Sequence, residues 1–247
     1  MTDDSDAADA GGVEPGAVAI RLGQAVLAVF AAFVAAAALV PIAADVGRFL
    51  GATQGSPALA VAETIGQTVG FAAAAVLFLV YAGDRELLRI RWPTRRESGF
   101  VVGGAVVLLV AQYALLLALS AVGVDVAQNR ALSPGADAPV YFLYMVVVSV
   151  LFVGPAEELL FRGVAQGELR RALPAPAAVA VAGFLFGSIH FFAGTGTATQ
   201  QAAYVLVATL LGCVLGSLYE DTGNLVVPAL AHGAYNGVLF LIQYLAA

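Results

Sequence analysis

Two glutamates and an arginine lie close together in an otherwise apolar stretch of the chain. Glu157 and Glu158 are adjacent, and Arg162 follows Glu158 by four residues. On an α-helix, residues four apart share a face, whereas adjacent residues point about 100° apart. This spacing predicts an ion pair between Glu158 and Arg162 and leaves Glu157 free to face a reaction site. A simpler interpretation is that both glutamates only mark the polar end of a helix.

The two histidines of the chain also lie within apolar stretches. Asn236 follows His232 by four residues, and His190 follows Phe186 by the same spacing. An imidazole and a carboxamide on one face offer hydrogen-bond donors to a developing oxyanion, although such side chains also join helices within membranes. Taken alone, His190 is more often a satisfied core residue. Polar groups at membrane depth usually face the interior of a helix bundle or a water-filled cavity. The glutamate pair and the two histidines therefore need a common explanation.

The composition places the chain among membrane proteins. Of its 247 residues, 61% are hydrophobic and only 11% are charged, whereas a soluble domain has about 45–50% apolar and about 25% charged residues. Several apolar stretches reach the roughly 20 residues that a helix needs to cross a bilayer. We therefore expect an integral membrane protein surrounded by lipid, and no nucleic-acid partner.

The apolar stretches predict an all-α fold, a polytopic transmembrane bundle with about seven membrane helices. The expected segments are 22–44, 58–82, 99–122, 140–169, 177–193, 199–218 and 225–245. The first three contain little chemistry. The last four contain the glutamates, both histidines and Asn236, so we expect the functional core there.

Arginine residues orient the predicted bundle in the cell membrane. Two of the loops are rich in them, with Arg85, Arg89, Arg91, Arg95 and Arg96 after the second segment, and Arg170 and Arg171 after the fourth. Short basic loops stay on the cytoplasmic side. We therefore expect a cytoplasmic N-terminus and an outside C-terminus.

Depth along the helices permits one common site. With Arg170 and Arg171 as the cytoplasmic boundary, Glu157 lies roughly 20 Å inside, at 1.5 Å per residue. His190 lies at about the same depth, roughly 20 Å, and His232 lies roughly 12 Å from the boundary of the last segment. These depths allow the side chains to meet near the middle of the membrane.

The N-terminal residues 1–17 are expected to form a disordered acidic tail. Acidic residues occur there among Ala and Gly, namely Asp3, Asp4, Asp6, Asp9 and Glu14, and such a segment cannot bury enough apolar surface to fold. The net charge of the chain is −6, and all eleven basic residues are Arg. An acidic surface without Lys resembles that of haloarchaeal proteins.

Three motifs follow one another along the chain, each within an apolar segment. They are E-E-x-x-x-R at 157–162, F-x-x-x-H at 186–190 and H-x-x-x-N at 232–236. With these motifs the chain resembles the CPBP family, the CAAX prenyl protease and bacteriocin-processing family of membrane proteases. The resemblance covers about residues 140–245. It implies a protease core over 139–247 within a transmembrane helical domain over 18–247.

The resemblance implies an intramembrane endopeptidase that hydrolyses a peptide bond of a membrane-anchored, CAAX-like substrate. Glu157 would be the general base that activates water, and Glu158 and Arg162 would support it. His190 would orient or polarise the water. The oxyanion would be stabilised by the pair His232 and Asn236.

Two interpretations of the site differ in whether it binds a metal ion. The resemblance covers members described as metalloproteases and others described as glutamate proteases. Glu157, His190 and His232 would supply three zinc ligands with an open position. However, the zinc-protease signature H-E-x-x-H is absent, and a Glu157 that binds metal cannot readily also be the base. We favour catalysis without a cofactor and keep zinc as the alternative.

Two other functions compete with the protease. A proton-relay transporter also uses Glu and His within a helix bundle, but inverted repeats with matched broken helices are typical of transporters and no such pairing is visible. A catalytically silent membrane scaffold or immunity protein would be indicated by a missing motif residue. All of the motif residues are present.

Overall fold

The computed structural model describes residues 14–83, 87–135 and 138–247. Of the predicted tail over 1–17, residues 1–13 lie outside the described residues, as does Arg85 of the predicted arginine-rich loop. The last residues of the predicted tail are helical, because helix α1 (Pro15–Phe49) already begins at Pro15. Proline suits this position because the first turn of a helix leaves its N–H groups without helical partners.

Six helices of the described chain are long and apolar enough to cross a membrane. They are α1, α2 (Pro57–Tyr81), α3 (Arg95–Ala121), the continuous helix Val140–Arg170, α8 (Ala198–Thr222) and α9 (Val226–Ala246). A seventh apolar helix, α7 (Ala175–Ile189), has 15 residues. The prediction of an all-α, multi-pass membrane protein with about seven membrane helices is confirmed.

Local sequence sets the ends of several helices. At the start of α3, the Thr94 side chain accepts a hydrogen bond from the Glu97 N–H, and the Glu97 carboxylate accepts one from the Thr94 N–H. Thr197 and Gln200 form the same capping box at the start of α8. α8 ends at Gly223, whose φ of 56° lies in the left-handed region. Glycine adopts this conformation without the steric cost of a Cβ.

The helix Val140–Arg170 contains two π-helical segments. It consists of α4 (Val140–Val148), the π-helical segment η3 (Ser149–Val153), α5 (Gly154–Glu158), the π-helical segment η4 (Leu159–Gln166) and α6 (Gly167–Arg170). Pro155 is the second residue of α5. Inside a regular α-helix, a proline loses a hydrogen bond and clashes with the carbonyl four residues earlier. The wider π-helical turn accommodates this change. The two glutamates therefore lie in one short α-helical stretch between two π-helical segments.

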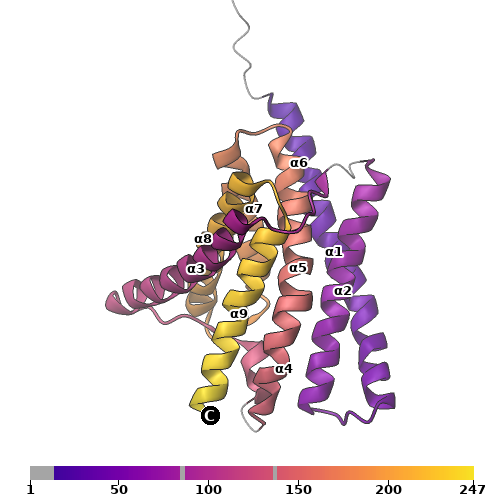
Figure 1. Ribbon diagram of the computed structural model, residues 1–247, viewed down its shortest axis with the longest axis vertical. Helices are drawn as coiled ribbons and strands as arrows, with labels where there is room; N and C mark the ends of the chain where they lie inside the picture. The colour runs from indigo at the N-terminus through magenta and orange to yellow at the C-terminus, as the bar shows by residue number, and fades with distance from the viewer. Residues whose placement is uncertain (1–13, 84–86, 136–137) are drawn as a thin grey trace, which may run out of the picture.

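The helix Val140–Arg170 lies between the α1–α2 pair and α9 (Figure 1). α7 packs against α8, and α3 crosses the outer side of α8 and α9. Glycines let the central helix and α9 approach closely. A Cβ at Gly154 would lie 2.5 Å from the Ala229 carbonyl oxygen, and a Cβ at Gly233 would lie 2.8 Å from that of Ser149. Backbone contact of this kind is typical of membrane helices.

A short β-ladder joins two loops of the bundle. β1 (Gln128–Asn129) pairs antiparallel with β2 (Gly194–Thr195), and η2 (Arg130–Gly135), a 3-10 helix, follows β1. The sequence did not predict this ladder, because two residues leave no visible alternation. Close to this ladder, α7 ends earlier than the sequence predicts. His190, expected within a membrane segment over 177–193, is instead the residue that caps this helix.

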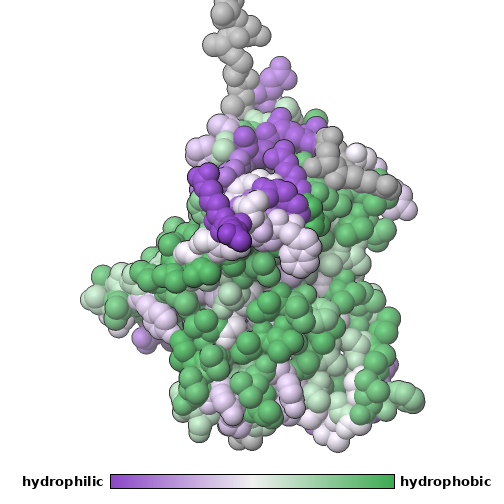
Figure 2. Space-filling model, viewed as in Figure 1, coloured by the Kyte–Doolittle hydropathy of each residue, from purple (hydrophilic) through white to green (hydrophobic). Residues whose placement is uncertain are grey.

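The surface is mainly hydrophobic, as a lipid environment requires (Figure 2). Large apolar side chains are exposed along the helices, for example Phe30 at 65% and Leu117 at 72%. Hydrophilic residues gather at the end of the bundle where α6 ends and α3 begins (Figures 1 and 2). Exposed apolar surface of this extent is uncommon in soluble monomers.

We expect a methyl group at Gly154 to destabilise the fold. In Gly154→Ala, the new Cβ would lie against the backbone of α9, so the free energy of unfolding should fall by about 1–3 kcal/mol. Gly103→Ala is the matched control, because a Cβ at Gly103 meets no atom within 4 Å. Thermal unfolding in detergent measures both variants, and equal midpoints would contradict the close contact between the two helices.

Candidate active site

A buried carboxylate links the central helix to α9. The Glu158 side chain is fully buried, and its Oε1 atom accepts hydrogen bonds from Arg162 Nη1 and His232 Nδ1, both at 2.9 Å. The predicted ion pair is therefore present, with the Arg162 side chain only 1% exposed. A carboxylate can only accept hydrogen bonds, so His232 Nδ1 carries the shared hydrogen. This bond fixes the orientation of the His232 ring.

Arg162 also connects Glu158 to α7 and α8. Its Nη2 atom donates to the Gly212 carbonyl of α8 at 2.7 Å. Its guanidinium lies over the Phe186 ring of α7, 4.8 Å from the ring centroid. Charge-assisted hydrogen bonds and cation–π contacts are strongest where water is excluded. One buried arginine thus fixes three helices relative to one another.

The Phe186 ring lies at the centre of the site. It contacts Phe161 edge-on, with ring centroids 5.2 Å apart. Its centroid also lies 4.6 Å from that of His190 and 5.7 Å from that of His232. Phe186 is 3% exposed. The ring therefore packs between the two histidines, which the chain separates by more than forty residues.

Glu157 differs from its neighbour Glu158 in burial and in hydrogen bonding. Its side chain is 13% exposed, and its Oε2 atom lies 3.9 Å from His232 Nε2, beyond a direct hydrogen bond. No hydrogen bond to the Glu157 carboxylate occurs among the described residues. The carboxylate interacts electrostatically with His190. Glu157 therefore faces the space between the two histidines.

His190 is held by the backbone of its own helix. Its Nδ1 atom lies 2.8 Å from the Phe186 carbonyl oxygen. A carbonyl only accepts, so Nδ1 is the protonated nitrogen of the neutral ring. The other nitrogen, Nε2, is then an acceptor. A water molecule beside this ring could donate to it.

Asn236 lies one helical turn after His232 on α9. The spacing of four residues places both on one face of the helix. The Asn236 side chain is partly exposed. Within the described chain, its carboxamide makes no side-chain hydrogen bond, so its N–H groups are available to a ligand. The structure thus brings Glu157 and both histidines close to one another around Phe186, and Asn236 lies one helical turn from His232.

Tyr204 of α8 borders the site, although none of the three motifs contains it. Its ring packs edge-on against His190, with ring centroids 5.7 Å apart. Its hydroxyl oxygen accepts a hydrogen bond from Asn129 Nδ2 of β1 at 2.9 Å. No sequence signal joins Tyr204 to His190, because the contact depends on how α7 packs against α8.

Tyr235 of α9 is a second aromatic neighbour that the motifs leave out. Its ring centroid lies 6.5 Å from that of His232. Its hydroxyl donates to Gln112 Oε1 of α3 at 3.0 Å. The spacing of three residues from His232 is a signal that could have located it, since residues three apart are neighbours on a helix.

The alternative zinc ligands do not converge. Among the described residues, no group of three or more His, Cys, Asp or Glu side chains is arranged to hold a metal ion. Ligand atoms about 2.0–2.2 Å from one tetrahedral zinc ion lie roughly 3.4 Å from each other. Glu157 lies 3.9 Å from His232, and no described contact within 4 Å joins Glu157 to His190. In this arrangement, the three side chains are not gathered around one ion.

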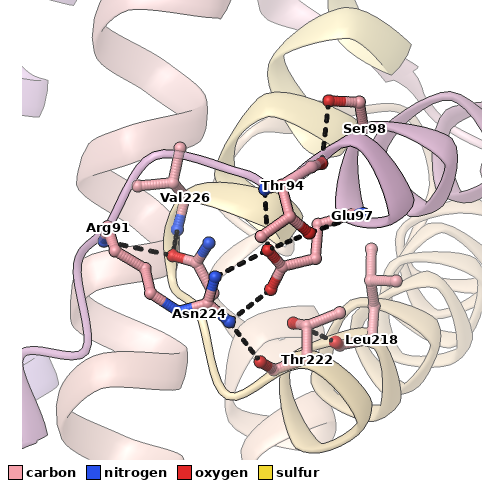
Figure 3. Close-up of polar contacts among 8 residues, drawn as sticks. All are labelled: Arg91, Thr94, Glu97, Ser98, Leu218, Thr222, Asn224 and Val226. Atoms are coloured by element: carbon pink, nitrogen blue, oxygen red, sulfur yellow. Dashed lines mark hydrogen bonds and ion pairs between the residues drawn. The ribbon is translucent and has the colours of Figure 1, made fainter.

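A second polar cluster fixes the start of α9 (Figure 3). Arg91 Nη1 donates to Glu97 Oε2 at 2.6 Å, and Arg91 Nη2 donates to Glu97 Oε1 and to the Thr222 carbonyl. Buried Asn224 accepts the N–H groups of Arg91 and Val226 at its Oδ1 atom, at 3.3 and 3.2 Å. The hydrogen bond to Glu97 raises the pKa of Arg91 above its ordinary value. The cluster sets the height of α9 in the bundle.

Removing the arginine of the buried pair should be costly. In Arg162→Leu, Glu158 becomes an unpaired buried charge, so the free energy of unfolding should fall by about 3–5 kcal/mol. Arg48→Leu is the control, because the Arg48–Asp45 pair is exposed, with side chains 45% and 78% accessible, and should change stability by less than about 1 kcal/mol. Thermal unfolding in detergent measures both variants, and similar losses would contradict the buried pair.

Comparison with known proteins places the site within a matched region. Residues 139–238 match the family described as type II CAAX prenyl endopeptidase Rce1-like. The chain is also 28% identical over 165 residues to a Bacillus subtilis (strain 168) protein named "Uncharacterized protein YpbD", covering 66% of this chain and 77% of that relative. No solved structure matches the chain. The region from residue 139 to residue 238, which contains all three motifs, is therefore similar to the Rce1-like type II CAAX prenyl endopeptidase family.

Proposed function

We propose that this protein is an intramembrane endopeptidase in which Glu157 activates water for attack on a peptide bond. The observation that carries the proposal is the contrast between two adjacent glutamates. Glu158 is fully buried and bonded to Arg162 and His232, whereas Glu157 is partly exposed and lies 3.9 Å from His232 Nε2. A single water molecule fits a polar separation of this length.

In the first step, Glu157 removes a proton from water while the water oxygen bonds to the carbonyl carbon of the substrate. The carbonyl π electrons move to oxygen, and a tetrahedral oxyanion forms. A general base of this kind contributes roughly 100- to 10,000-fold to the rate. In the second step, the C–N bond breaks and the proton on Glu157 passes to the departing amine, which restores the Glu157 carboxylate.

His190 is suited to hold the water. With its hydrogen on Nδ1 and bonded to the Phe186 carbonyl, its Nε2 atom accepts a hydrogen bond from the water. The water then has two acceptors, Glu157 and His190, which direct its lone pair toward the substrate. Orientation of this kind lowers the entropic part of the barrier.

His232 and Asn236 are suited to stabilise the oxyanion. The Glu158 carboxylate accepts a hydrogen bond from His232 Nδ1, which leaves Nε2 toward the site. Nε2 donates to the oxyanion when the ring carries a second proton. The Asn236 carboxamide supplies a second donor from the same face of α9. Fixed donors in a site that excludes water stabilise developing negative charge strongly.

The substrate class follows from the family and the surroundings of the site. The family name refers to CAAX prenyl substrates, and the site lies on helices that are long and apolar enough to cross a membrane. We propose a membrane-anchored, CAAX-like peptide or protein, whose anchor keeps the scissile bond near the bilayer. The arginine-rich end of the bundle would face the cytoplasm, with the C-terminus outside.

Replacing the proposed base should abolish cleavage. Glu157→Gln keeps the shape of the side chain but cannot accept the proton, so cleavage of a quenched fluorescent peptide should fall roughly 100- to 10,000-fold. The panel should contain lipidated and unlipidated peptides, and the protein should be purified in detergent. Glu63→Gln is the matched control, since Glu63 lies in α2 outside the site and should leave activity unchanged.

A zinc chelator provides the second arm of this experiment. Wild-type cleavage should persist in its presence. Activity lost with the chelator and restored by zinc would overturn the metal-free mechanism and return His190 and His232 to a ligand role. Cleavage by Glu157→Gln at the wild-type rate would overturn Glu157 as the base.

A further inference from the structure

The hydrogen bond between Asn129 and Tyr204 has a defined direction. Asn129 Oδ1 accepts the Ala131 backbone N–H at 2.8 Å. The carboxamide nitrogen must therefore point the other way, toward the Tyr204 hydroxyl at 2.9 Å. If the amide were reversed, its NH₂ group would face the Ala131 N–H, and two donors would meet. The Tyr204 oxygen is the acceptor, so its own proton is left for another partner.

The β-ladder holds Asn129 and Tyr204 in this arrangement. Asn129 lies opposite Gly194 in the ladder, and a Cβ at Gly194 would lie 3.1 Å from Tyr204 Cδ1 and 3.2 Å from Ala127 Cβ. The Ala127 N–H bonds to the carbonyl of Gln200, one helical turn before Tyr204. Both ends of the contact are thus fixed by backbone structure, which limits the positions that the hydroxyl can reach.

The Tyr204 ring borders the candidate site. It packs edge-to-face against His190, and its hydroxyl lies within electrostatic range of Glu157. Within the described chain, no acceptor takes the Tyr204 proton. A hydroxyl that is only partly buried can donate its proton to water in the free protein, and a ligand bound beside Glu157 and His190 can replace that water as the acceptor.

We propose that Tyr204 donates a hydrogen bond to the oxygen of the scissile carbonyl, and that Asn129 is the positioning residue that directs this donor. The inference rests on the proposed endopeptidase function and adds a third donor to His232 and Asn236. The bond to the carbonyl oxygen strengthens as that oxygen gains negative charge in the tetrahedral intermediate. It is therefore worth more in the transition state than in the bound substrate.

Tyr235 is the control, because its hydroxyl proton already has an acceptor within the protein. It also lies beside a site histidine, but its proton is donated to Gln112 Oε1. Removing the Tyr235 hydroxyl deletes a hydrogen bond between α9 and α3, with no donor lost from the site. Tyr204→Phe and Tyr235→Phe thus remove the same atom from two tyrosines that each contact one site histidine.

The first measurement compares the steady-state kinetics of these two variants with the wild type in detergent. Tyr204→Phe should lower kcat about 100-fold with little change in KM, as expected for a lost oxyanion donor. It should also weaken binding of a peptide whose scissile amide is replaced by a tetrahedral phosphinate, by a factor similar to the loss in kcat/KM. Tyr235→Phe should keep the wild-type kcat and phosphinate affinity.

The second measurement reverses the hydrogen bond without removing the tyrosine. In Asn129→Asp, the carboxylate still accepts from the Ala131 N–H, but its other oxygen now accepts the Tyr204 proton. The donor is then withdrawn from the site, and kcat should fall about 10-fold or more. Thermal unfolding of each variant checks the fold. If Tyr204 had a purely structural role, Asn129→Asp would preserve kcat, because this variant retains the Tyr204 hydroxyl.

The outcomes separate this inference from the proposed function. Wild-type cleavage that requires Glu157, together with unchanged kcat and phosphinate affinity in Tyr204→Phe, would overturn the role of Tyr204 and leave the endopeptidase intact. Unchanged kcat in Asn129→Asp would overturn Asn129 as the positioning residue. A wild-type protein that cleaves no peptide and does not bind the phosphinate would overturn both proposals.

Discussion

The site depends on the buried ion pair between Glu158 and Arg162. Taking two charges out of water is expensive, and their mutual attraction offsets this only when further hydrogen bonds satisfy both groups. Here the carboxylate also accepts from His232, while the guanidinium bonds to the Gly212 carbonyl and lies over the Phe186 ring. Each of these partners comes from a different helix. The contacts of one buried pair therefore join α7, α8 and α9 to the central helix.

Much of the fold follows from the sequence because bilayer thickness sets the length of an apolar helix. The predicted segments 58–82 and 225–245 differ from α2 and α9 by only one residue at each end. The Glu158–Arg162 pair was predictable as well, since it is a local contact on one helix. The π-helical segments beside Pro155 leave no periodic signal, because their effect on apolar spacing is small.

The parts that sequence reasoning missed depend on contacts between distant segments. His190 was expected inside a membrane helix, but the turn after it and the β-ladder make it the residue that ends α7. The Tyr204–His190 contact joins two helices, and the Asn129–Tyr204 bond joins a loop to a helix. A helical pattern identifies which residues share a face. It does not identify which faces meet.

The adjacent positions of Glu157 and Glu158 give two carboxylates different surroundings. Neighbouring residues on a helix point about 100° apart, so one can enter the core while the other stays beside the reaction space. Glu158 is held by Arg162 and His232, and a proton on it would weaken both contacts. Glu157 has no such partners among the described residues, so it can gain and release a proton without disturbing the helices. The buried contacts thus hold Glu158 rigidly, whereas Glu157, which has no such contacts among the described residues, suits the proton transfer that we propose for it.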